Sequence, residues 1–263
     1  MRSVIGLAIL LTACTTPDNA PQAAFPAGQL IDLTHVYNAE TPFWPTADGF
    51  ELDVDFAGMT DGGYWYEANT FRTAEHGGTH LDAPVHFAEG KHSTDQIPLE
   101  RLVAPAVMID VSEAALADAD YQIAPSDLQA WEAEHGEIPD GHILLFRTGY
   151  AQFWPDRVSY MGTDERGPDA VAKLHFPGIH PDAAQWLVDN RSVAAVGLDT
   201  PSIDFGQSSD FLSHRILFEA NIPAFENVAE MAALPATGFS IIALPMHIEA
   251  GSGGPLRIVA VVP

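Results

Sequence analysis

HGGTHLDAPVHF, residues 76–87, carries more chemical information than any other segment of this 263-residue chain. From Thr79 onward, polar and apolar residues alternate, and residues two apart in an extended chain share a face. We therefore expect His80, Asp82 and His86 to project together into a cleft. The opposite face should anchor the segment in the core through Leu81, Ala83, Val85 and Phe87.

Two glycines precede this strand and favour a tight turn that brings His76 beside His80. They also disfavour a helix, which excludes a zincin-like HxxxH helix. Two imidazoles and a carboxylate suit a divalent metal with positions left open for water and substrate. Such an ion acidifies its water and polarises a carbonyl, which suits hydrolysis, and a further histidine close by, His86, suits proton transfer. The alternative is a turn whose histidines only bond backbone groups.

The composition excludes several classes of function. The chain has 36 acidic and 11 basic residues, a formal charge of −25, whereas nucleic acids and anionic lipid surfaces require clustered Lys and Arg. A single cysteine permits neither an internal disulfide nor a Cys-rich zinc site, so a bound metal must use His and carboxylates. With 47% hydrophobic and 18% charged residues, the chain has an ordinary globular composition.

The N-terminus is typical of an exported protein. Residues 1–13 hold one positive charge and a short apolar run, too short to span a membrane but suited to a signal peptide. The small residues before Cys14 resemble a bacterial lipoprotein signal, which predicts lipidation of Cys14 and a place on the periplasmic side of the envelope. A plain secretory signal, giving a soluble periplasmic protein, is the alternative. Residues 14–28 are rich in Pro, Ala and Thr and are interpreted as a flexible tether.

Residues 29–263 contain neither a second linker nor a repeat, and their mixed strand and helix patterns predict one α/β or α+β domain. Alternation or apolar runs predict strands, some of them half-buried, at residues 30–36, 51–56, 64–71, 105–111, 143–146, 193–198, 241–244 and 258–262. Helices are expected at residues 126–134, with Ser126 as N-cap, 181–190 and 211–220.

The segment at residues 76–87 closely resembles the HxGTHxDxPxH signature of the cyclase-like metal-dependent hydrolases, the family of bacterial kynurenine formamidase and isatin hydrolase. The resemblance covers residues 29–263. It extends to TPFWP (41–45), LFRTGY (145–150), GLDTPSID (197–204), His214 and Glu226 twelve residues apart, LP (244–245) and GGPLR (253–257).

The resemblance implies a fold, a metal centre and an assembly. The fold would be the single-domain cyclase-like α/β architecture, related to swivelling β/β/α domains, in a homo-oligomer. His86 would be the general acid/base. The ions, zinc or manganese and one or two in number, would be held by His76, His80 and Asp82 in one set and by Asp82, His214 and Glu226 in a second, with Glu226 touching both.

Other residues have weaker assignments. Trp44 matches a Trp that lines the substrate pocket in the formamidases, with Phe43 beside it; either is alternatively a core residue. Asp199 and Asp204, which follow a predicted buried strand, each support a metal ligand or brace a turn. Arg147 binds a substrate carboxylate or forms an internal salt bridge. The aromatic residues 64–66 are candidates to line the same cleft.

We therefore expect a hydrolase that cleaves the amide C–N bond of a small aromatic substrate with metal-activated water. By resemblance, an aryl formamide such as N-formylkynurenine comes first and a cyclic amide or lactone second, since the same residues serve both reactions. A non-catalytic periplasmic lipoprotein that binds a metal or a solute is the competing class, but it gives His86 no purpose.

Overall fold

The computed structural model describes residues 28–263. The predicted signal peptide (1–13), Cys14 and all but the last residue of the predicted tether (14–28) lie outside the described residues. Within the described part of the chain, no helix is long and apolar enough to cross a membrane.

An eight-stranded mixed sheet forms the centre of the domain. Its strand order is β1-β12-β11-β5-β7-β9-β10-β4. Strand β4 pairs with β12 as well as with β10, so the sheet closes on itself into a barrel, and β1 extends it at the far end of β12. The strands are β1 (Gln29–Asp32), β4 (His80–Asp82), β5 (Val103–Asp110), β7 (Ile143–Arg147), β9 (Ala195–Leu198), β10 (Ala224–Glu226), β11 (Phe239–Pro245) and β12 (Gly253–Val262).

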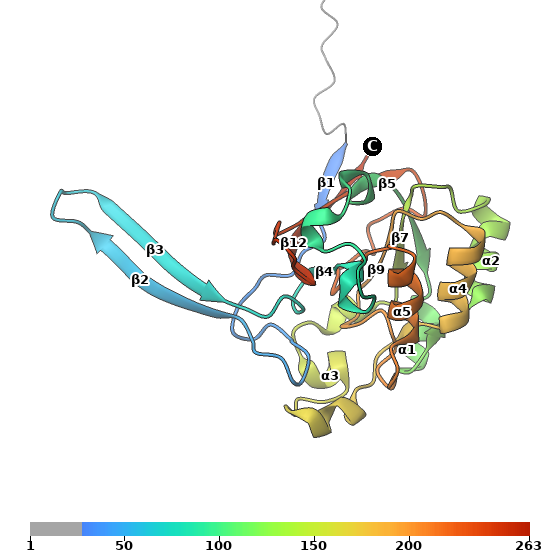
Figure 1. Ribbon diagram of the computed structural model, residues 1–263, viewed down its shortest axis with the longest axis horizontal. Coiled ribbons are helices and arrows are strands. Elements are labelled where there is room, and N and C mark those ends of the chain that lie inside the picture. Colours follow the sequence, from blue (N-terminus) through green and yellow to red (C-terminus); the bar gives the residue numbers. More distant parts are fainter. Residues whose placement is uncertain (1–27) are drawn as a thin grey trace, which may run out of the picture.

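Helices cover one side of this barrel, where α2, α4 and α5 lie together (Figure 1). The run Ile143–Phe146 is buried on both sides because Ile143 and Leu145 join the apolar cluster that also holds Leu81 and Phe225, whereas its other two side chains pack toward the helices. The helices are α1 (Ser112–Ala117), α2 (Pro125–His135), α3 (Arg157–Met161), α4 (Pro181–Asn190) and α5 (Leu212–Glu219), with a small pair of strands, β6 (Gln122–Ile123) and β8 (Gly178–Ile179).

The predicted elements are present, with corrections at their ends. The expected helix at residues 181–190 is confirmed at both ends. Helix α2 begins at Pro125, and Ser126 is not its N-cap: the carboxylate of Asp127 accepts a hydrogen bond from the backbone N–H of Ala124 (2.7 Å) and satisfies that end of the helix. The first strand stops at Asp32, four residues earlier than expected.

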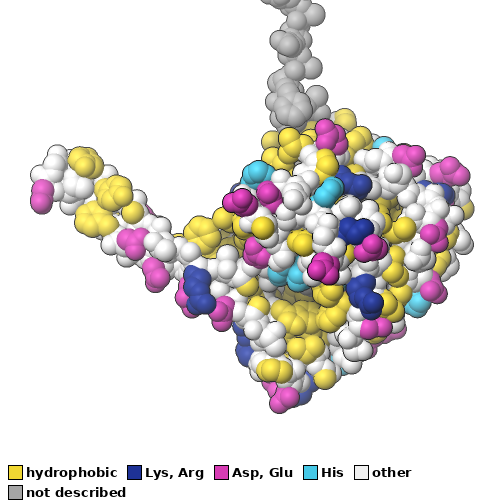
Figure 2. All heavy atoms as spheres, viewed as in Figure 1, with side chains coloured by type: hydrophobic (Ala, Val, Ile, Leu, Met, Phe, Trp, Pro, Cys, Tyr) yellow, Lys and Arg dark blue, Asp and Glu magenta, His cyan; other side chains and the backbone are white. Residues whose placement is uncertain are grey.

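A long hairpin, hereafter the arm, protrudes from the barrel. It consists of β2 (Glu51–Met59) and β3 (Trp65–Arg72), paired antiparallel with a bulge between Val54 and Phe56. The prediction that residues 51–56 form a half-buried strand is wrong, because the arm leaves the body (Figures 1 and 2) and successive residues of both its strands are exposed. Leu52 and Trp65, for example, are 55% and 61% exposed.

Candidate metal and active site

The site begins with β4, which carries His80 and Asp82 on one side and Leu81 in the core on the other, as the alternation predicts. The antiparallel register places Glu226 of β10 directly opposite His80. Its carboxylate Oε2 consequently lies 3.4 Å from His80 Nε2, while Asp82 Oδ1 lies 3.0 Å from the same nitrogen. Strand pairing alone therefore brings together one imidazole and two carboxylates.

A glycine turn adds His76, as predicted. Gly78 has a left-handed backbone (φ 61°), and a Cβ there would lie 2.4 Å from the ring of Tyr37. A Cβ on Gly77 would lie 2.0 Å from the ring of Phe43. The turn is therefore restricted to glycine by both shape and space, and it brings His76 Nδ1 within 2.6 Å of Asp82 Oδ1.

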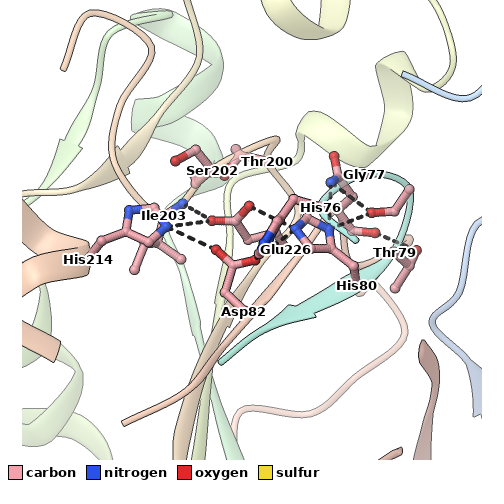
Figure 3. A network of polar contacts seen from close by, with 12 residues as sticks. His76, Gly77, Thr79, His80, Asp82, Thr200, Ser202, Ile203, His214 and Glu226 are labelled. Atoms are coloured by element: carbon pink, nitrogen blue, oxygen red, sulfur yellow. Dashed lines mark hydrogen bonds and ion pairs between the residues drawn. The ribbon is translucent and has the colours of Figure 1, made fainter. Parts of the chain in front are cut away.

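Helix α5 supplies His214 from the other side of the site (Figure 3). Its Nε2 lies 3.2 Å from Asp82 Oδ2 and 3.2 Å from Glu226 Oε1. Asp82 thus faces histidines with both of its oxygens, and Glu226 does the same between His80 and His214.

The five side chains form two sets whose ligand atoms lie within 4.8 Å of one another: His76, His80 and Asp82, and Asp82, His214 and Glu226. These are the sets that the resemblance implies. His80 Nε2 is buried without a hydrogen bond of good geometry, although two carboxylate oxygens are nearby. Ligand atoms aimed at common points in this way fit a divalent cation, and His with carboxylate suits zinc or manganese.

Without a metal, protons must balance the buried carboxylates. Burial alone lowers the pKa of a histidine, but Asp82 and Glu226 outweigh burial and raise the pKa of His80. Burial also acts to lower the pKa of His214, but hydrogen bonds to three carboxylates hold that pKa well above the usual value. Burial also opposes ionisation of Asp82, yet the charges of His76 and His80 lower its pKa well below the usual range. Burial and the charge of Asp82 raise the pKa of Glu226.

His86 reaches the site by a different path from the one predicted. The alternating strand ends at Asp82, and a 3₁₀ turn (Pro84–His86) follows, because Pro84 begins the turn and the N–H of His86 bonds to the carbonyl of Ala83 (2.9 Å). The ring of His86 stacks on the ring of His76, with 3.8 Å between the two ring centroids. Burial lowers the pKa of His86 to about 4, so its ring is neutral at neutral pH.

A cavity of about 300 Å³ opens above the five ligand side chains and His86. Both Trp44 and Phe43 line it, although Phe43 is 1% exposed and also packs under the glycine turn. Phe87 packs against the core as predicted, but only half-buried: it also lines the cavity, because the 3₁₀ turn changes the phase of the chain. The remaining apolar wall consists of Pro42, Ala47, Ala74, Met161, Pro201 and Phe211.

Three further candidates lie outside the cavity. The aromatic residues 64–66 sit at the tip of the arm, far from the site of their own chain, so the expectation that they line it is wrong for a single chain (Figure 1). Arg147 forms the predicted internal salt bridge, to Asp110 at 2.8 Å. Asp199 accepts hydrogen bonds from Thr148 and Gly149, which matches its turn-bracing alternative rather than support of a ligand.

Asp204, in contrast, does support a ligand, as one of its two predicted roles: its Oδ2 lies 2.5 Å from His214 Nδ1. Sequence analysis missed the polar residues Glu75 and Ser252 and the cavity residue Phe211. Phe211 carried a usable signal, because it lies three residues before His214 at the start of an amphipathic helix. Ser252 carried none, because its partner lies 177 residues away in the chain.

This fold and site define a metal-dependent hydrolase, and the comparisons agree. Residues 31–205 match the Cyclase family ("Putative cyclase"). The chain is 33% identical to isatin hydrolase of Roseibium aggregatum, over 89% of this chain and 92% of that protein, and 29% identical to kynurenine formamidase of Salinibacter ruber, over 88% and 96%.

The solved structure of isatin hydrolase A from Ralstonia solanacearum is 32% identical, with a TM-score of 0.80 and coverage of 89% and 92%. The chain therefore belongs to the cyclase family of metal-dependent hydrolases. The single-domain α/β fold expected from the sequence is confirmed.

We predict that divalent metal affinity rises with pH, since His80 and His214 must lose protons before they can bind an ion. Both pKa values lie above the usual histidine value of about 6.5, so affinity should keep climbing as the pH rises above that value. Calorimetric titration of the metal-free protein in buffers of different ionisation enthalpy measures both the affinity and the protons released. Constant affinity as the pH rises, without proton release, would contradict the assigned protonation states.

Proposed function

We propose that this protein hydrolyses the amide C–N bond of a small aromatic substrate. The observation that carries the proposal is the convergence of two metal-ligating sets, joined through Asp82, with the unprotonated His86 at the floor of an aromatic-walled cavity. Similarity to isatin hydrolase and kynurenine formamidase supports the same reaction class.

His76, His80 and Asp82 would hold one divalent ion, and His214 and Glu226 with Asp82 a second. When bound, such an ion lowers the pKa of water and polarises a carbonyl group. His86 is placed to take a proton from the attacking water as its oxygen bonds to the carbonyl carbon. The same ring then returns that proton to the nitrogen as the C–N bond breaks, so His86 ends the cycle neutral.

The cavity wall favours a flat aromatic substrate. The ring centroids of Trp44 and Phe211 lie 6.2 Å apart, and those of Phe87 and Phe211 lie 5.2 Å apart. These rings surround the substrate with apolar groups above the polar side chains at the floor of the cavity. An aryl formamide of the N-formylkynurenine type remains our first candidate. A cyclic aryl amide is the second, supported by the 33% identity to isatin hydrolase.

We predict that His86→Ala lowers turnover by about 10²- to 10⁴-fold, the usual contribution of a positioned acid/base group, with unchanged metal content. The measurement compares N-formylkynurenine, isatin and a panel of lactones with one metal-loaded preparation, followed by elemental analysis. Exposed His135 provides the matched control, and His135→Ala should retain full activity.

Ring opening of isatin without cleavage of the formamide would exclude the formamidase assignment and retain the amidase class. If neither amide turned over, and His86→Ala bound the same ligands as the unsubstituted chain, the proposed enzyme would be excluded in favour of a binding protein.

We further propose that the protein forms a homo-oligomer through the arm. An isolated two-stranded hairpin is at best marginally stable in water, and large apolar patches on a surface mark interaction sites. Figure 2 shows apolar groups along the visible face of the arm. The exposed large apolar side chains of the arm are Leu52, Val54, Phe56, Met59, Tyr64, Trp65, Tyr66 and Phe71. A second copy of the chain would cover these side chains.

Replacing residues 51–72 by a short Gly-Ser linker should convert the oligomer into a monomer with the same fold, because the barrel does not depend on the arm for a strand. Light scattering during size-exclusion chromatography measures the mass. The double variant Asp53→Asn and Asp55→Asn, on the same arm, should leave the mass unchanged. A monomeric unsubstituted protein at micromolar concentration would contradict the proposal.

We also propose, from the sequence before residue 15, that the protein is exported and lipid-anchored at Cys14. Cys14→Ser should release the protein from the membrane fraction and abolish incorporation of labelled fatty acid in a bacterial host. Fractionation of cells that express either form measures how much protein lies in the membrane fraction. Hydrolase activity, which does not require Cys14, serves as the control that both forms are folded. Equal release of both forms into the periplasm would support plain secretion instead.

A further inference from the structure

Each metal-facing histidine has a second ring nitrogen that points away from the site, and the partner of that nitrogen decides where the ring proton lies. His80 Nδ1 lies 2.9 Å from the carbonyl of Gly78, which can only accept, so His80 carries its proton there. His214 Nδ1 lies 2.5 Å from the carboxylate of Asp204, with the same result. Once each ring has lost its second proton, the remaining proton therefore stays on Nδ1, and Nε2 can bind a cation.

His76 is arranged the other way round, with Nδ1 toward Asp82 and Nε2 outward. Its outer nitrogen lies 2.9 Å from Ser252 Oγ. A hydroxyl both donates and accepts, so Ser252 alone leaves the position of the ring proton open.

Glu75 removes that ambiguity. Its Oε2 lies 2.6 Å from Ser252 Oγ and 3.1 Å from the backbone nitrogen of Ser252. A carboxylate only accepts, so the hydroxyl proton of Ser252 is directed to Glu75. The lone pairs of Ser252 Oγ then accept from His76 Nε2–H, so the proton of the neutral ring is held on Nε2 and Nδ1 can bind a cation that takes its place beside Asp82.

Packing fixes the same ring from the side. A Cβ on Gly253 would lie 2.5 Å from His76 Cε1, so the ring rests directly on the backbone of that glycine. The carbonyl of Ser252 accepts a hydrogen bond from the N–H of Ala83 at the end of β4 (2.8 Å), which ties the Ser252 loop to the strand that carries the other two ligands.

We propose that Glu75, acting through Ser252, is the positioning residue that orients His76 and sets the affinity of the His76–His80–Asp82 set for a divalent cation. The inference rests on the metal-binding role in the proposed function and extends it. His80 and Asp82 are held by strand pairing, whereas His76 comes from a turn and depends on this relay. The Asp82–His214–Glu226 set depends on Asp204 instead.

The test measures Zn²⁺ and Mn²⁺ binding to metal-free full-length protein by equilibrium dialysis and elemental analysis. Glu75→Ala and Ser252→Ala should each weaken one class of site about 10- to 100-fold, the usual effect of removing the group that orients a ligand. Glu249→Ala removes an exposed carboxylate from the loop that precedes Ser252 and should leave affinity unchanged. Ser252→Thr keeps the hydroxyl and should retain affinity.

A double-variant cycle separates a relay from two independent contacts. Because Glu75 acts only through Ser252, the double variant should bind no more weakly than Ser252→Ala alone, whereas Asp204→Ala combined with Glu75→Ala should give additive losses. Nitrogen-15 NMR of His76 in the unsubstituted, zinc-loaded protein should show the Nε2–H tautomer, and zinc-loaded Glu75→Ala should show a weaker preference for it. Thermal melts confirm that each variant is folded.

The outcomes separate this inference from the proposed function. If the unsubstituted protein bound neither ion, the metal-dependent function itself would fail. If it bound an ion and Glu75→Ala matched Glu249→Ala, or the Glu75 and Ser252 losses added, the relay would be overturned and the proposed function would stand.

Discussion

The structure depends on the burial of two carboxylates, Asp82 and Glu226, in the interior of a small domain. Charges removed from water are tolerated only with partners, and three histidines converge on this pair from a turn, a strand and a helix. The barrel makes the convergence possible because β4 pairs on both sides, with β10 placing Glu226 opposite His80 and β12 closing the ring. The strand pairings that close the barrel therefore also place the ligands of the metal centre.

Much of this site could be predicted from the sequence, and the limits have physical causes. The alternation through His80, Leu81 and Asp82 predicted the ligand face because a period of two survives in any strand. The alternation ends at Asp82 because a proline starts a 3₁₀ turn and changes the phase, so Phe87 lines the cavity as well as packing against the core. The arm has the same alternation as a half-buried strand, yet what covers a strand is a tertiary property that its own residues do not encode. The link between Glu75 and Ser252, 177 residues apart, leaves no local pattern.

Two kinds of element line the cavity, and each supplies a different type of side chain. The polar floor comes from strands, a turn and a helix that are fixed by the barrel, and the aromatic wall comes largely from loops around Trp44 and Phe211. Loops tolerate substitution better than paired strands do. Relatives with the same floor can therefore differ in the aromatic groups they accept, which is consistent with one family containing both an isatin hydrolase and a kynurenine formamidase.

The arm has a mechanical consequence. Its first strand begins seven residues after Trp44, and its second strand ends three residues before Glu75. The arm is therefore connected at one end to the aromatic wall of the cavity and at the other end to the turn that carries His76. If a neighbouring molecule bound the arm and displaced it, both segments that connect the arm to the cavity would be displaced together. Occupancy of the arm and the shape of the cavity would then be coupled quantities, and each would report on the other.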